Sequence, residues 1–117
     1  MTALQTLDPV PSQTVCPSAV VWINGRHAIV ARMSGDGRIS THEIDRGVEP
    51  ELSYLALVIH SIGDQERVMI LGQSSVRLAL EREYVAIYRR PDRLVDVEPA
   101  ETIDTGELVD RVRALAT

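Results

Sequence analysis

Ala19-Val20-Val21-Trp22-Ile23-Asn24-Gly25 is the stretch that decides the fold of this 117-residue chain. The run from Ala19 to Ile23 is wholly apolar, which is typical of a strand covered on both faces and therefore central in its sheet. Asn24-Gly25 then predicts a two-residue type I′ hairpin turn, because both residues tolerate a positive φ. The stretch predicts a buried first strand that turns back into an antiparallel second strand.

Four more strands are expected from similar patterns. The second covers His27–Met33, and the tight turn Ser34-Gly35-Asp36-Gly37 leads into a third over Arg38–Ile44. The third alternates polar and apolar residues, which suits a strand at or near an edge with one wet face. The fourth, Arg67–Leu71, is apolar after its first residue, and the fifth covers Arg93–Glu98.

Helical periodicity marks three segments. The first begins at Pro50, which a first helical turn accepts, and ends at Gly63. Its inner stripe is expected at Leu52, Leu55, Ala56, Ile59 and Ile62. The second runs from an N-cap at Ser74 or Ser75 to about Tyr88. Its inner stripe is expected at Val76, Ala79, Leu80, Glu83 or Tyr84, and Ile87. The third starts among the caps of Thr102–Thr105 and is buried through Leu108, Val109, Val112 and Leu115.

The predicted order of strands and helices along the chain is β-β-β-α-β-α-β-α. Short turns force the first three strands antiparallel, and helical crossovers force strands four and five parallel, with helices on both faces. If the two wholly apolar strands lie inside, the strand order is 3-2-1-4-5. We therefore predict an α/β fold with a mixed five-stranded, ribonuclease H-like sheet over residues 18–117, preceded by a flexible, Pro-rich extension over residues 1–17.

The net charge of the chain indicates which classes of binding partner are unfavourable. Twelve Arg, with no Lys, stand against seventeen acids, and the net charge is −5. This disfavours broad attraction to DNA, RNA or an anionic membrane, although a local basic patch can still form. The use of Arg alone indicates a GC-rich coding genome more than a demand for guanidinium groups.

The chain shows neither disulfide nor membrane signals. Cys16 is the single cysteine, so an intramolecular disulfide is excluded. Met1–Leu7 has no signal-peptide pattern, and no apolar run reaches membrane-spanning length. We expect a cytoplasmic protein with no membrane partner, no DNA partner and no cofactor.

A two-metal nuclease on this fold would need clustered carboxylates, beginning with an Asp at the end of the first central strand. Asn24 stands there, and a neutral amide argues against catalysis. His27, His42 and His60 fall on different elements without metal-ligand spacing. We expect no metal site and no catalytic residue.

The turn after the fourth strand is the first candidate site. In Gly72-Gln73-Ser74-Ser75-Val76-Arg77 a strand feeds a helix N-terminus, whose free N–H groups can hold a phosphate or a carboxylate. The candidate ligand-binding residues are Gly72, Gln73, Ser74, Ser75 and Arg77. The turn lacks the second Gly and the Lys of a P-loop, so a plain strand-to-helix turn with a Ser cap is the alternative interpretation.

A group of arginines near the end of the second helix is the second candidate. Arg82, Arg89, Arg90 and Arg93 fall close enough to form a small basic patch for RNA phosphates. The alternative is that they are helix C-terminal cations favoured by the helix dipole. No aromatic side chains are interleaved to stack bases.

Several segments together resemble the short bacterial translational machinery proteins, which are similar to the central domain of the archaeal and eukaryotic class 1 release factor and of Pelota. The segments are Val20–Asn24, His27–Val30, Leu71-Gly72, Arg93–Glu98 and Thr105–Val109. The resemblance covers residues 19–115. It implies a ribonuclease H-like domain associated with translation.

The chain differs from that family at positions that bear on its activity. Its first strand usually ends Trp-Ile-Asp, where this chain has Asn24, and a Lys usually stands where this chain has Arg77. The release factor's Gly-Gly-Gln loop has no counterpart between Ile44 and Glu51. We therefore expect a non-catalytic binding module, related to the release-factor central domain, that associates with ribosomes or translation under stress and contacts the ribosome or RNA through the local Arg patch. The alternatives are a metal-dependent nuclease and a homodimeric interaction scaffold that pairs through the edge strand Arg38–Ile44.

Overall fold

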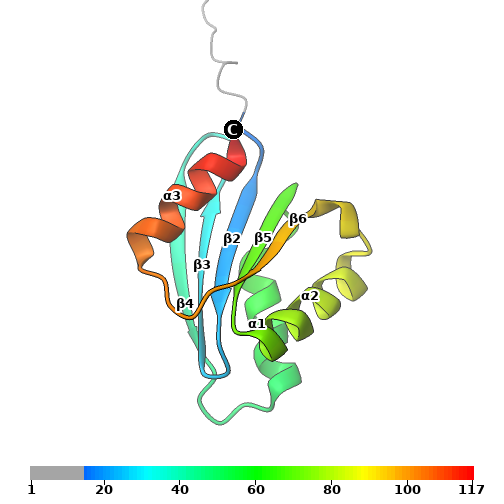
Figure 1. The fold of residues 1–117 in the computed structure, drawn as a ribbon. Helices are drawn as coiled ribbons and strands as arrows, with labels where there is room; N and C mark the ends of the chain where they lie inside the picture. The colour runs from blue at the N-terminus through cyan, green and yellow to red at the C-terminus, as the bar shows by residue number, and fades with distance from the viewer. Residues whose placement is uncertain (1–14) are drawn as a thin grey trace, which may run out of the picture.

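The computed structural model describes residues 15–117, which form a five-stranded mixed sheet with helices on both faces (Figure 1). The strands are β2 (Ser18–Ile23), β3 (His27–Met33), β4 (Ile39–Asp45), β5 (Arg67–Gly72) and β6 (Leu94–Pro99). The helices are α1 (Glu51–Ile62), α2 (Ser74–Tyr88) and α3 (Thr105–Ala116), and a short 3-10 turn, Pro91–Arg93, precedes β6. The spatial order β4-β3-β2-β5-β6 confirms the order 3-2-1-4-5 expected from the sequence.

Strand β2 is the centre of the sheet. It pairs antiparallel with β3 and parallel with β5, and all six of its residues are buried. The outer pairs are antiparallel for β3 with β4 and parallel for β5 with β6. The apolar run that opened the sequence is therefore the central strand, as expected from its lack of any polar residue.

The two faces of the sheet carry different helices. Val21 and Ile23 of β2 pack in a core with α1 and α2. Val20 and Trp22 point to the opposite face, where they pack with α3. Figure 1 shows α3 in front of the sheet and the other two helices behind it. The prediction of helices on both faces is confirmed.

The first hairpin is present, but the expected type I′ turn is wrong. Neither Asn24 nor Gly25 has a positive φ. Instead the Asn24 side-chain oxygen accepts the N–H groups of Arg26, at 2.7 Å, and His27, at 2.8 Å. The Asn24 backbone N–H also donates to the His27 oxygen, at 3.0 Å. The side chain and backbone of Asn24 together close the turn without a left-handed residue.

The inner stripe of α1 is rotated from the expected one. Tyr54 and Val58 are fully buried, whereas Leu52 is 66% exposed and Ala56 is exposed as well. The expected burial of Leu55, Ile59 and Ile62 is confirmed, and periodicity alone fits both stripes because they share these three residues. Burial of Tyr54 is favoured because its hydroxyl donates to the backbone oxygen of Asn24 at 3.0 Å.

Helix α2 also differs from expectation at its outer end and at its cap. Tyr84 is fully buried, with its hydroxyl donating to the Gly63 oxygen at 3.1 Å, and Ile87 is 53% exposed rather than buried. The helix begins at Ser74, so Gln73 occupies the N-cap position and makes no side-chain capping bond. The expected N-cap role of Ser74 or Ser75 is wrong.

Of the predicted extension, residues 1–14 lie outside the described residues. The next three residues contact the domain. Val15 packs on the core beneath α3, and the Cys16 N–H donates to the Ala116 oxygen at 3.1 Å. The Pro17 oxygen accepts the Glu66 N–H at 2.9 Å. Within residues 15–117, no helix has the length and apolar character needed to cross a membrane.

The parallel pairing of β2 with β5 ends in an unusually close approach. Gly72 has φ +143°, and a Cβ at this position would lie far inside van der Waals contact with the Ile23 carbonyl oxygen and 3.0 Å from the Ile23 nitrogen. The Gln73 N–H then donates to that same Ile23 oxygen at 3.2 Å. Only glycine fits at this point without moving one of the two central strands.

The variant Gly72→Ala is expected to lower the free energy of unfolding by about 3 kcal/mol or more, because the added methyl meets backbone rather than a movable side chain. Urea denaturation of both proteins measures the difference. Gly25→Ala is the matched control, since its Cβ would meet nothing within 4 Å and its φ is not positive. Equal stability of Gly72→Ala and the native protein would contradict the close approach.

Burial raises the pKa of Tyr54 and of Tyr84 above the ordinary value. In the unfolded chain both phenols ionise near pH 10, so above that pH the unfolded state loses protons that the folded state retains. Stability is therefore expected to be complete below about pH 10 and to fall as the pH rises further. Denaturation midpoints across this range measure the slope. Tyr54→Phe is expected to flatten it, and an unchanged slope would contradict the burial of this phenol.

Candidate functional site

The carboxyl ends of β5 and β6 form a crevice. After Gly72 the chain enters α2 on one face of the sheet, whereas after Pro99 it crosses to α3 on the other face. Two neighbouring strands whose connections leave to opposite faces create a crevice that α/β proteins commonly use for ligands. Here the hollow measures about 460 Å³ and is lined by Gly72, Gln73, Pro99, Ala100 and Glu101.

Backbone bonds hold the floor of this hollow in place. The Ala100 N–H donates to the Gly72 oxygen at 3.1 Å. The indole Nε1 of Trp22 donates to the Ala100 oxygen at 3.0 Å, although Trp22 is only 5% exposed. Because Trp22 is the single tryptophan of the chain, its fluorescence would report on the wall of the hollow.

The structure brings the predicted anion-site residues together at the start of α2. Gly72 is buried, Gln73 and Ser75 are exposed, and Ser74 opens the helix. The Arg77 guanidinium turns back onto the loop, where Nη1 donates to the Gly72 oxygen at 3.1 Å. Its Nε is buried and has no partner in the described part of the chain. Arg77 therefore braces the loop.

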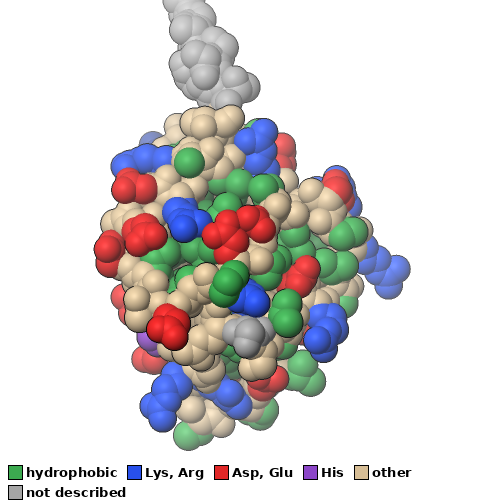
Figure 2. Space-filling view, viewed as in Figure 1, with side chains coloured by type: hydrophobic (Ala, Val, Ile, Leu, Met, Phe, Trp, Pro, Cys, Tyr) green, Lys and Arg blue, Asp and Glu red, His purple; other side chains and the backbone are tan. Residues whose placement is uncertain are grey.

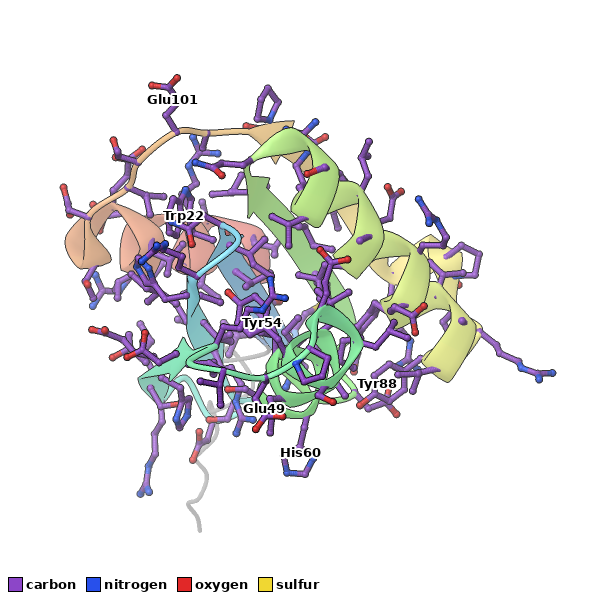
Figure 3. All side chains as sticks on the ribbon, turned by 90° about the horizontal axis from the view of Figure 1, so that it is seen from below. Trp22, Glu49, Tyr54, His60, Tyr88 and Glu101 are labelled. Carbon is purple, nitrogen blue, oxygen red and sulfur yellow. The ribbon has the colours of Figure 1, made fainter. Side chains whose placement is uncertain are left out.

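The opposite wall was missed by the sequence analysis. Pro99, Ala100 and Glu101 reach the hollow because β6 pairs with β5. The predicted strand order implied this pairing, but the predicted site included only the turn after β5. Glu101 stands at the rim with its side chain pointing outward (Figure 3). A carboxylate there opposes anion binding, so the hollow combines helix N–H donors and the Gln73 amide with a negative rim. This arrangement favours a neutral polar ligand over a strongly charged anion.

The four arginines of the predicted patch do not act as one group. Arg90 forms a two-bond ion pair with Asp92, at 3.2 Å for each bond, and this bonding holds the pKa of Asp92 below its ordinary value. Arg93 is bound by the Asp64 carboxylate and by the Gln65 oxygen, and its side chain is only 18% exposed. These two arginines serve the protein's own structure.

Arg82 and Arg89 remain as outward cations. Both are exposed, and neither forms an ion pair within residues 15–117. Arg82 lies within α2, and Arg89 follows the helix as its C-cap residue. Arg82 borders a shallow hollow of about 390 Å³ together with Leu78, Glu81 and Val85. Two of the four predicted arginines are thus exposed without an ion-pair partner in the described residues.

The side-chain oxygen and both backbone polar groups of Asn24, the residue at the expected metal-ligand position, form hydrogen bonds within the fold. Its amide oxygen closes the β2–β3 turn, and its backbone oxygen accepts the Tyr54 hydroxyl. His27 lies against Trp22 with ring centroids 5.3 Å apart, His42 is exposed on β4, and His60 points away from α1 (Figure 3). No group of three or more His, Cys, Asp or Glu within residues 15–117 is placed to hold a metal ion.

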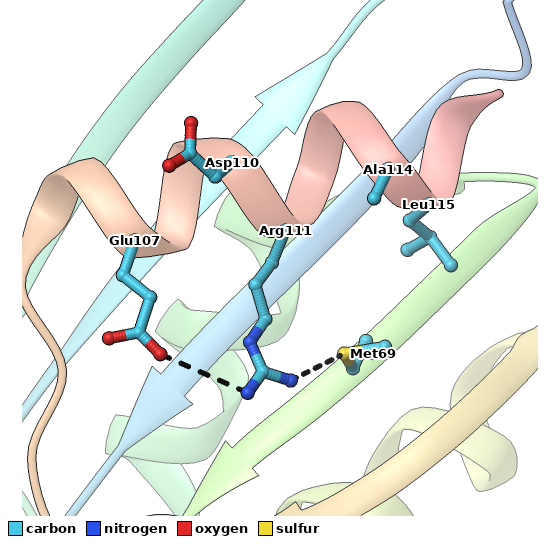
Figure 4. A pocket seen from close by; sticks show the side chains of 6 residues that line it. All are labelled: Met69, Glu107, Asp110, Arg111, Ala114 and Leu115. Atoms are coloured by element: carbon cyan, nitrogen blue, oxygen red, sulfur yellow. Dashed lines mark hydrogen bonds and ion pairs between the residues drawn. The ribbon is translucent and has the colours of Figure 1, made fainter.

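A second hollow lies beside α3, on the face shown in Figure 2. It measures about 490 Å³ and is lined by Met69, Glu107, Asp110, Arg111, Ala114 and Leu115 (Figure 4). Arg111 spans it, 3.2 Å from the Glu98 carboxylate and 3.8 Å from the Met69 sulfur. Its apolar floor and acidic rim were not predicted, because they join residues of α3 to residues of β5.

The chain is similar in structure to Archaeoglobus fulgidus Pelota, with a TM-score of 0.64 and 12% identity over 90% of this chain. The fold is that of one part of Pelota. Thermoplasma acidophilum Pelota matches over 86% of this chain, with a TM-score of 0.61 and 19% identity. The chain spans 33% of the length of each of these proteins. No protein-family model and no curated protein sequence matches it.

Arg89 provides a test of the geometry around the outward cations. It ends α2 in the left-handed conformation, with φ 58°, where glycine is normally preferred. Arg89→Gly and Arg89→Ala both remove the charge, but only alanine keeps the backbone strain. We expect the glycine variant to be more stable than the alanine variant by about 1 kcal/mol. Thermal denaturation of the pair measures this, and equal stability would contradict the left-handed cap.

Proposed function

We propose that this protein is a cytoplasmic, non-catalytic binding module that associates with ribosomes or with other RNA of the translation machinery. The observation that carries the proposal is the match of 90% of the chain to one part of Pelota at a TM-score of 0.64. A shared fold at low identity does not transfer an activity, so the role rests on the surface chemistry as well.

The residue at the end of the central strand supports a binding role rather than nuclease activity. A two-metal nuclease needs an acidic ligand at the end of β2, and the Asn24 side chain found there already accepts two backbone N–H groups. The loop between β4 and α1 contains no Gly-Gly-Gln sequence, so transfer of peptidyl-tRNA hydrolysis has no basis. A metal-dependent nuclease on the same scaffold remains the competing hypothesis, and titration calorimetry with Mn²⁺ separates the two.

The outer side of α2 is the surface we assign to RNA. Arg82, on this helix, and Arg89, at its C-cap, are both exposed and lack acidic partners in the described residues. Guanidinium groups of this kind bind phosphate oxygens in a salt-dependent way without reading sequence. Because the chain carries a net charge of −5, contact through this limited patch is more favourable than broad electrostatic attachment.

Sedimentation of native lysate through a sucrose gradient tests the proposal. We expect the protein in ribosomal fractions at low salt, and we expect R82E/R89E to lower the bound fraction about tenfold, because phosphate contacts become repulsive. R113E, which reverses one charge instead of two, is the control on another surface. Arg113 is also exposed, but it lies on α3 and pairs with Asp110 at 3.6 Å.

Two outcomes would contradict these assignments separately. Absence of the native protein from every ribosomal fraction, in growth and in stress, would contradict the association with ribosomes. Equal loss of binding by R113E and R82E/R89E would contradict the assignment of the RNA surface to α2.

A further inference from the structure

The two faces of the sheet are covered unequally. On one face, α1 and α2 pack over β2, β3 and β5 and reach Leu94 and Val97 of β6. On the other face, α3 packs on β2, on β3 and on Leu71 of β5, and it is the only helix there in the described part of the chain (Figure 1). Strands β5 and β6 therefore border an open groove beside α3, which we call the α3 groove.

The floor of the α3 groove is apolar. It consists of Met69 on β5 with Ala114 and Leu115 on α3, around the hollow of about 490 Å³ shown in Figure 4. Met69 is partly exposed and Ala114 is exposed. Methionine is unbranched and polarizable, so its side chain adapts to apolar partners of different shape. The floor therefore suits an aliphatic side chain supplied by a partner.

Acidic side chains border this floor on both sides. On β6, the register with β5 places Asp96 beside Met69, and Glu98 follows on the same side of the strand. On α3, Glu107 and Asp110 line the hollow, with side chains 54% and 77% exposed. Four carboxylates thus surround one apolar floor.

Arg111 is the cation at the centre of the groove, and it satisfies these acids incompletely. Its guanidinium lies 3.2 Å from the Glu98 carboxylate but 3.9 Å from that of Glu107. Asp96 forms no ion pair with the described residues, and one of its oxygens accepts the Val97 N–H at 2.9 Å. The rim therefore keeps carboxylate oxygens that a further cation can bind.

Two other arginines stand at the border of the groove. Arg113 pairs with Asp110 at 3.6 Å, but it does not line the hollow, and both side chains are more than half exposed. Arg67 donates to the Leu115 oxygen at 2.8 Å, which places its charge at the carboxyl end of α3. The middle of the groove and the end near Glu107 remain acidic.

We propose that the α3 groove binds a basic peptide segment of a protein partner, in which lysine or arginine flanks an aliphatic side chain. The aliphatic side chain would rest on Met69 and Leu115, and the flanking cations would bind Asp96, Glu107 and Asp110. Neighbouring side chains of an extended segment diverge, so the cations beside a seated aliphatic group are directed away from the floor and towards the rim.

The chemistry of the groove favours this occupant over others. The acids of the rim repel the phosphates of nucleic acids and of anionic membranes. A small cation such as a polyamine matches the acids but leaves most of the apolar floor open to water. Residues 1–14 of the chain contain neither Lys nor Arg, so they bring no side-chain cation to the rim. The proposal does not depend on the association with ribosomes, because α2 lies on the opposite face of the sheet.

Fluorescence anisotropy on the full chain, with a labelled peptide of alternating lysine and leucine, tests the groove. We expect saturable binding that weakens as salt is added, because exposed ion pairs are screened. A peptide of alternating lysine and glycine should bind about tenfold more weakly, because it covers the floor with no aliphatic side chain.

Matched variants locate the binding site. E107Q/D110N removes two carboxylates of the rim, and we expect it to raise the dissociation constant about fivefold. E81Q/E83Q removes the same number of acids from α2, on the other face, and should bind like the native protein. A114K places a cation at an exposed position of the floor and should abolish binding. Thermal denaturation of each variant checks that it is folded.

Three outcomes would overturn the proposal. Unchanged affinity in both E107Q/D110N and A114K would place the peptide elsewhere. Equal binding of the leucine and glycine peptides would show attraction by charge alone. A two-copy mass in light scattering that A114K returns to one copy would identify a second copy as the occupant. R82E/R89E should bind the peptide no less tightly than the native protein, so a failed RNA surface and a failed groove are distinguishable.

Discussion

The close contact between Gly72 and Ile23 is the constraint on which the other features depend. It lets the two central strands, β2 and β5, stay parallel and in register to their last residues. The Ile23 oxygen can then bind the Gln73 N–H, and the Gly72 oxygen can accept from both Ala100 and Arg77. A side chain at residue 72 would separate the strands at the point where α2 and the segment after β6 leave the sheet.

This constraint also explains why the candidate hollow has a rigid floor. Ala100 is held between Gly72, through its N–H, and Trp22, through its oxygen. Trp22 belongs to the core beneath α3, whereas Gly72 leads into α2 on the other face. The hollow therefore lies where the two layers of the protein are joined, and a ligand there would touch segments from both.

The sequence was a good guide where burial alone decides the structure. The wholly apolar strand from Ala19 to Ile23 could only be central, and the strand order followed from it. Local patterns failed where a distant hydrogen bond decides between near-equal alternatives. Tyr54 turned inward rather than Leu52 because its hydroxyl reaches Asn24, thirty residues away, and Asn24 closed its turn with a side chain rather than with a positive φ.

The candidate sites show the same limit. The glycine and helix start at residues 72–77 are visible in the sequence, and the structure places them at one edge of the hollow. Arginine pairing is not visible in this way. The acid that binds Arg93 is Asp64, which lies twenty-nine residues earlier in the chain. Long side chains find partners that depend on the whole fold, so only Arg82 and Arg89 remain available from a cluster of four.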